Sequence, residues 1–64
     1  MIEEMTKERA FAILGLPMDA NFSAASLAFR NLRDKYHPDI NPRKRREYTE
    51  VVGAFEYLQR MFSN

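Results

Sequence analysis

The chain contains no cysteine, and that absence alone excludes several kinds of protein. Disulfide-stapled scaffolds, thiolate zinc sites and cysteine nucleophiles all need sulfur. Histidine occurs once, at His37, which argues against a transition-metal site built from protein ligands. Only two glycines are present, so no glycine-rich loop can cradle a phosphate group. We therefore expect no bound cofactor and no metal.

Long apolar runs are also missing. No stretch approaches the roughly 20 apolar residues that span a bilayer, and residues 1–10 mix acids and cations, unlike a secretory signal. A chain of 64 residues forms a single domain, residues 1–64, whose thin core leaves little room for an enclosed active site. The sequence therefore predicts a small soluble, cytoplasmic binding module, with no membrane partner and no enzymatic activity.

Charge is unevenly placed along the chain. Residues 30–46 hold seven cations and two acids, a net charge of +5, whereas the other residues hold three cations and seven acids, a net charge of −4. A basic middle on a nearly neutral chain predicts one electropositive face and an acidic partner surface. A solvated helix face with no partner has the same composition, and it stays open as the alternative.

The first predicted helix covers about residues 6–14. Thr6 can cap its first turn, and Gly15 stands where a left-handed residue ends a helix. Ile2 and Met5, which precede it, either extend this helix or pack loosely against it.

The second predicted helix covers about residues 21–36. Asn21 and Ser23 are the two candidate caps, and Pro38 disfavours helical geometry at the residue before it. An apolar stripe along this segment follows helical spacing.

The third predicted helix covers about residues 44–62 and starts between residues 42 and 46. Asn41 followed by Pro42 has the form of a cap and first-turn pair, but the cations at 43–46 oppose the positive end of the helix dipole. Gly53 lies mid-helix, where it either allows close packing against another helix or is simply tolerated.

These elements predict an all-α fold, since no segment alternates with a period of two. The second and third helices form an antiparallel hairpin, and the short first helix packs across it. Met61 and Phe62 are expected to cover the end of the core. The centre of the core is predicted at five apolar residues: Phe29, Leu32, Val51, Phe55 and Leu58.

The loop after the second helix holds the most informative residues. Pro38 and Pro42 each fix a φ angle and remove a backbone donor, so the loop is stiff for its length. His37 and Asp39 flank the first proline, which suits a rigid polar prong beside a basic surface. No nucleophile is placed with them, which argues against catalysis. A lone histidine at a helix end is equally compatible with a structural role.

The basic run at residues 43–46 favours two further hypotheses, phosphate contact and a targeting signal. Nucleic-acid recognition usually adds stacking or base-contacting groups, yet the aromatic residues fall mainly on the predicted core stripes. We therefore expect no specific nucleic-acid binding.

Four segments together resemble the J domain of the DnaJ-like co-chaperones. Residues 36–39 read Tyr-His-Pro-Asp after a basic amphipathic helix, and residues 11–16 are similar to the family's first helix. Residues 28–32 and the third-helix pattern around residues 48–58 are similar as well. The resemblance covers about residues 9–60.

This resemblance implies a monomeric module that binds a DnaK-type heat-shock chaperone and stimulates its ATP hydrolysis. The His-Pro-Asp tripeptide would be the trigger, basic residues of the second helix would dock on an acidic surface, and Tyr36 would be mainly structural. The candidate partner-binding residues are His37, Pro38, Asp39, Arg30, Lys35, Arg33 and Asn41.

Several departures from the family pattern bear on docking. Ser26, Asn31 and Ile40 replace residues that are often cationic, Asp34 places an acid beside the docking face, and the loop is a few residues shorter. The family's fourth helix is absent or reduced to residues 60–64. The alternative function is a J-like interaction module that binds or competes without activating the ATPase.

Overall fold

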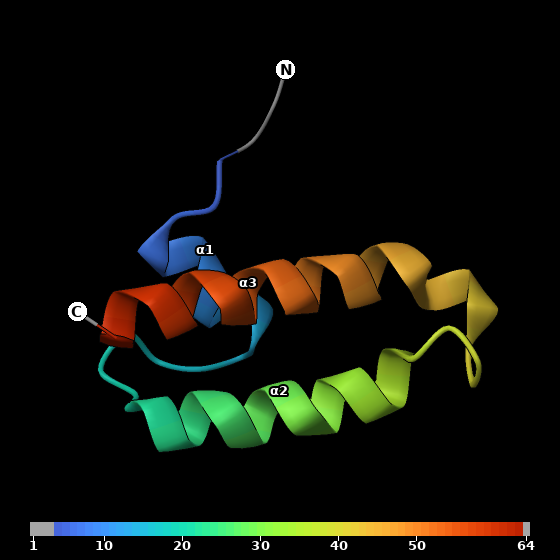
Figure 1. The fold of residues 1–64 in the computed structure, drawn as a ribbon, viewed down its shortest axis with the longest axis horizontal. Coiled ribbons are helices and arrows are strands. Elements are labelled where there is room, and N and C mark those ends of the chain that lie inside the picture. The colour runs from blue at the N-terminus through green and yellow to red at the C-terminus, as the bar shows by residue number, and fades with distance from the viewer. Residues whose placement is uncertain (1–3, 64) are drawn as a thin grey trace.

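The computed structural model describes residues 4–63, and three α-helices carry the fold in that part of the chain (Figure 1). Helix α1 spans Lys7–Ile13 and α2 spans Phe22–Tyr36. A 3-10 helix, η1 at Pro42–Lys44, runs directly into α3 at Arg45–Ser63. The expected all-α class is confirmed, and residues 4–63 contain no strand.

The first two helices begin after side-chain caps that the sequence predicts, and the third begins within its predicted range. The side chain of Thr6 accepts a hydrogen bond from the Arg9 amide at 3.1 Å, and that of Asn21 accepts one from the Ala24 amide at 2.9 Å. Asn41 makes no side-chain cap bond to η1. Asn41 and Pro42 nevertheless stand at the start of η1, and α3 itself begins at Arg45, inside the predicted range of residues 42–46.

The turn that follows α1 contains a glycine in a backbone conformation that residues with a side chain rarely adopt. Gly15 has a φ of 71°, in the left-handed region. The Gly15 amide donates to the Ala12 carbonyl at 3.0 Å, and the Leu16 amide donates to the Phe11 carbonyl at 2.9 Å. This pair of bonds is a Schellman motif, which turns the chain away from α1.

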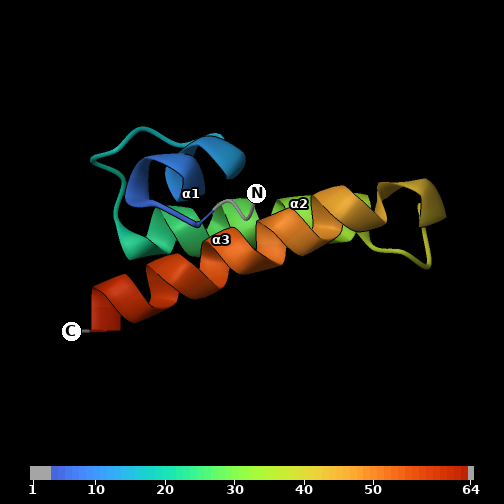
Figure 2. The same cartoon turned by 90° about the horizontal axis from the view of Figure 1, so that it is seen from above.

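Helices α2 and α3 lie side by side as an antiparallel hairpin (Figure 1), and α1 rests on one side of it (Figure 2). Helix α1 packs mainly against α3. Met5 packs on the core ahead of α1 without extending the helix, whereas Ile2 lies outside the described residues. Residues 60–63 continue α3, so the described part of the chain has no separate fourth helix.

The centre of the core lies closer to α1 than the sequence predicts. Val51 and Leu58 are buried as expected, but Phe29, Leu32 and Phe55 are only half-buried. The reason is that α1 covers one side of the hairpin and inserts its own apolar side chains there. The buried residues are Ala10, Phe11, Leu14, Ala25, Val51, Ala54 and Leu58.

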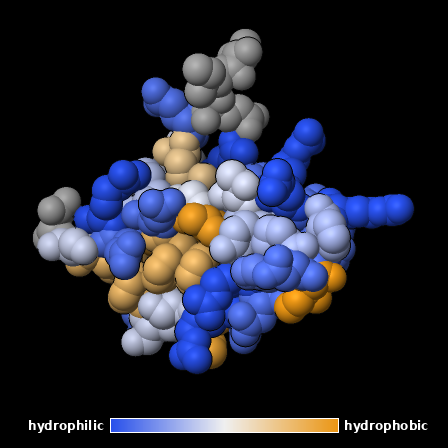
Figure 3. Space-filling view, turned by 45° about the vertical axis from the view of Figure 1, so that its right-hand side comes forward, coloured by the Kyte–Doolittle hydropathy of each residue, from blue (hydrophilic) through white to orange (hydrophobic). Residues whose placement is uncertain are grey.

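Four phenylalanine rings follow one another along the seam between α2 and α3, and we call them the phenylalanine ladder. Phe29 stacks on Phe55 with ring centroids 4.2 Å apart, and Phe55 stacks on Phe22 at 5.6 Å. Phe22 in turn meets Phe62 at 5.6 Å. Phe62 keeps 40% of its surface exposed. Apolar side chains gather in a patch on the face shown in Figure 3, with polar side chains around it.

Gly53 does not serve close helix packing, so that expectation is wrong. A methyl group built on Gly53 would meet only the end of the Met5 side chain, at 3.7 Å, which is an ordinary van der Waals contact. The alternative, simple tolerance of a weak helix former, describes this position.

Candidate functional site

The loop between α2 and η1 is held together by hydrogen bonds to His37. Pro38 holds His37 in an extended conformation with φ −56° and ψ 133°, which ends α2 at Tyr36. The amides of Ile40 and Asn41 then both donate to the His37 carbonyl, at 2.9 and 2.8 Å. Asn41, predicted as a partner-binding residue, is half-buried and gives its backbone to this turn.

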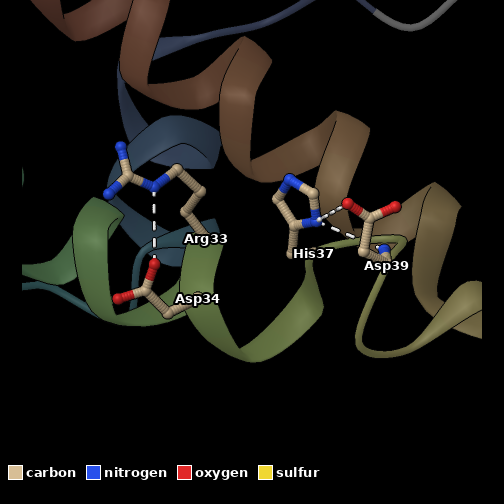
Figure 4. A network of polar contacts seen from close by, with 4 residues as sticks. All are labelled: Arg33, Asp34, His37 and Asp39. Atoms are coloured by element: carbon tan, nitrogen blue, oxygen red, sulfur yellow. Dashed lines mark hydrogen bonds and ion pairs between the residues drawn. The ribbon is translucent and has the colours of Figure 1, made fainter.

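The side chains of His37 and Asp39 are brought together at this loop (Figure 4). The Asp39 amide donates to Nδ1 of His37 at 3.2 Å. Oδ2 of Asp39 lies 3.7 Å from the same nitrogen, beyond hydrogen-bond distance. The Asp39 side chain is 90% exposed, so its carboxylate is available to a cation outside the molecule.

Tyr48 also belongs to this site, although it is not among the site residues predicted from the sequence. Its ring meets that of His37 edge-on, with centroids 5.5 Å apart and planes at 67°. Both residues are half-buried. The only signal in the sequence was an aromatic residue on the first turn of the third helix, and that pattern does not reveal which loop side chain it meets.

Arg33, one of the predicted partner-binding cations of α2, pairs with an acidic residue of the same helix. Nε of Arg33 lies 3.6 Å from Oδ1 of Asp34, with both side chains well exposed (Figure 4). Its guanidinium carbon also lies 5.6 Å from the ring centroid of Phe29. Exposed ion pairs are weak, but Asp34 still lowers the positive potential that a partner would meet at Arg33.

Arg30 and Lys35 are both exposed, but they do not share a face of α2. At about 100° per residue, five residues place them about 140° apart around the helix. The ammonium group of Lys35 lies 5.4 Å from the Tyr36 ring centroid, and Arg30 makes no ion pair with any residue in 4–63. Leu27, one turn before Arg30 on the same face, is 61% exposed and was not predicted as part of the site.

The basic run Arg43–Arg46 surrounds the start of α3. All four side chains are exposed, and within the described residues none of them forms an ion pair. Because successive helical residues point in different directions, these cations are distributed around the helix and do not form a single basic face.

A cavity of about 200 Å³ lies near this end of α2 but apart from the loop. Ile13, Tyr36, Glu47 and Glu50 line it, and neither His37 nor Asp39 does. Oε2 of Glu47 is buried without a hydrogen-bond partner. Across residues 4–63, no set of three acidic or histidine side chains is placed to hold a metal ion, and no helix has the length and apolar character needed to cross a bilayer.

Comparison with known proteins shows similarity to one kind of chaperone. DnaJ of Lactobacillus acidophilus is 39% identical over 56 residues, which cover 84% of this chain and 15% of that protein. DnaJ of Streptococcus thermophilus is 45% identical over 47 residues, 70% of this chain and 12% of that protein. DnaJ of Synechococcus elongatus is 37% identical over 51 residues, 75% of this chain and 18% of that protein. No family model and no solved structure matches the chain.

The chain belongs to the DnaJ-like J-domain family. It spans about a sixth of the length of the DnaJ proteins that it matches. This J-domain chain holds its His-Pro-Asp tripeptide in the turn between α2 and η1, where the aspartate is exposed and the histidine ring is fixed on two sides.

Proposed function

We propose that this chain is a co-chaperone module that docks on a DnaK-type chaperone and stimulates its ATP hydrolysis through the loop of His37, Pro38 and Asp39. The module itself hydrolyses nothing and needs no cofactor. It acts as a monomer in the cytoplasm, the compartment expected from the sequence.

The observation that carries this proposal is the conformation of the loop. Three successive amides, those of residues 39–41, donate to His37, so the tripeptide is already ordered before any partner binds. Pre-ordering lowers the entropy lost on binding. The Asp39 carboxylate, exposed and without a hydrogen-bond donor among the described side chains, is placed to meet a cationic group of the chaperone.

Docking is proposed to use the outer face of α2. Leu27 and Arg30 are exposed there, one helical turn apart, and together offer an apolar contact and an unpaired cation. Lys35 lies toward the other side of the helix and Arg33 is partly neutralised by Asp34. Arg30 is therefore expected to contribute more to docking than either of the other two cations.

The test is a steady-state ATPase assay of a DnaK-type chaperone with and without this chain. Wild type is expected to raise the rate, and His37→Gln and Asp39→Asn are expected to abolish the increase while circular dichroism shows an intact fold. Arg60→Ala, at the far end of α3, is the matched control. A folded His37→Gln protein that stimulates like wild type would remove the proposal.

The alternative module, which binds without activating, gives a different result in the same assay. It would compete with an active J-domain protein for the chaperone yet leave the basal rate unchanged. The presence of all three residues of the tripeptide favours activation, because a module that only binds has no need of the trigger.

A pair of titrations separates chaperone docking from phosphate binding. Arg30→Ala is expected to weaken binding to the chaperone's nucleotide-binding domain by about fivefold, more than Lys35→Ala and more than neutralising two residues of Arg43–Arg46. Binding to a mixed-sequence DNA duplex is expected to be weak and steeply salt-dependent. Tight DNA binding that is lost with the Arg43–Arg46 charges, together with no chaperone binding, would reverse this ranking.

A further inference from the structure

The ring of His37 accepts a hydrogen bond, and this fixes where its proton lies. The Asp39 amide can donate to Nδ1 only when that nitrogen carries no hydrogen. A neutral imidazole then carries its hydrogen on Nε2. The loop therefore selects one of the two tautomers before any partner arrives.

The second nitrogen of His37 is the one left for a partner. Nε2 lies on the side of the ring away from Asp39 (Figure 4). Nε2 has no hydrogen-bond partner in residues 4–63. Among the buried side-chain nitrogen and oxygen atoms of those residues, only Oε2 of Glu47 lacks a partner, so Nε2 is not buried. The Tyr48 ring, edge-on at 5.5 Å, restricts the orientation of the imidazole.

We infer that His37 meets the chaperone as a single aimed hydrogen-bond donor, Nε2–H, whose partner is an acceptor oxygen, and that Tyr48 is the residue that positions it. The inference rests on the proposed function. The Asp39 amide selects the tautomer and Tyr48 limits the ring rotamers. The carboxylate of Asp39 stays free for a different, cationic group of the partner.

The variant His37→Asn separates the two roles of the histidine side chain, accepting from the Asp39 amide and donating to the partner. The side-chain oxygen of the asparagine can accept from the amide two residues later, as in an Asx turn, so the loop keeps its hydrogen bond. Its own amide donor lies closer to the backbone than Nε2 and cannot reach the same acceptor. His37→Asn is therefore expected to keep the Asp39 amide protected from exchange and to lose ATPase stimulation.

The first measurement uses the free protein. Long-range proton–nitrogen spectra of the His37 ring are expected to show, for the neutral imidazole, hydrogen on Nε2 and none on Nδ1. Tyr48→Phe should keep this pattern, whereas Tyr48→Leu should give a mixture of tautomers. Tyr57→Leu, nine residues further along α3 and also half-buried, is the control for a general loss of stability.

The second measurement is the ATPase assay. Tyr48→Leu is expected to lower the maximal stimulation by about two- to tenfold, the range of one aromatic contact, with little change in the half-saturating concentration. A ring that carries its hydrogen mainly on Nδ1, or a His37→Asn protein that stimulates like wild type, would overturn the inference. If Tyr48→Leu changes stability but neither the ring signals nor the stimulation, Tyr48 has no positioning role. If wild type fails to stimulate, the proposed function falls, and the free-protein spectra still decide the tautomer.

Discussion

Replacing Phe11 with alanine should destabilise this protein more than the same change at Phe55. Phe11 is 1% exposed and lies between α1 and the hairpin, whereas Phe55 is half-buried in the phenylalanine ladder. Truncation of a fully buried phenylalanine costs about 3–5 kcal/mol. For Phe55 we expect about 2–3 kcal/mol, because its side chain is only half-buried, although it stacks on two other rings.

The total stability makes this difference measurable. At about 0.05–0.15 kcal/mol per residue, a 64-residue domain has about 3–10 kcal/mol in all. Phe11→Ala should therefore remove between about a third and all of the folding free energy, and Phe55→Ala should remove less. Urea unfolding followed by far-ultraviolet circular dichroism gives both values. A Phe55→Ala cost equal to or above that of Phe11→Ala would refute the placement of the core beside α1.

Three further changes test the fold and the docking face. Gly53→Ala should stabilise α3 by about 1 kcal/mol, because the added methyl meets only Met5 at 3.7 Å; a lower melting temperature would contradict the open space there. Removing residues 61–64 should lower the melting temperature without abolishing helix content, because Met61 packs on the core; no change would show that this end is frayed. Asp34→Asn should tighten chaperone binding by about two- to fivefold, the range of an exposed ion pair, and unchanged affinity in a titration would place Arg33 outside the docking face.

Helix boundaries could be predicted from the sequence because their causes are local. Thr6, Asn21 and Gly15 each act within a few residues of their own position, and Pro38 ends α2 through its effect on the residue before it. The loop that presents the tripeptide follows from the same signals. Arg30 and Lys35, which the sequence places off the apolar stripe of α2, are exposed. Their separation around α2 could also be obtained from the sequence, by counting residues along the helix.

Packing between elements could not be predicted in this way. An apolar stripe shows which face of a helix is buried but not how far the partner covers it, so Phe29 and Phe55 were expected at the centre of the core. Phe29 instead packs against the edge of that core and is only half-buried, and Phe55 is half-buried as well. The contact between Tyr48 and His37 depends on the path of the intervening loop, which no spacing rule describes.

The phenylalanine ladder has a consequence for the order in which the hairpin forms. Phe29 and Phe55 are 26 residues apart in the chain, whereas Phe22 and Phe62 are 40 apart. Extending the closed loop from 26 to 40 residues costs only about 0.4 kcal/mol, less than the roughly 0.5–1.5 kcal/mol of one aromatic pair. Once the pair nearest the loop, Phe29 and Phe55, has formed, each later pair is favourable. The contacts between the two helices therefore form in order, starting near the tripeptide and ending at the far end of the hairpin. The pair of Phe22 and Phe62 is then the last to form and the first to open, and amide exchange should be fastest at that end of α3.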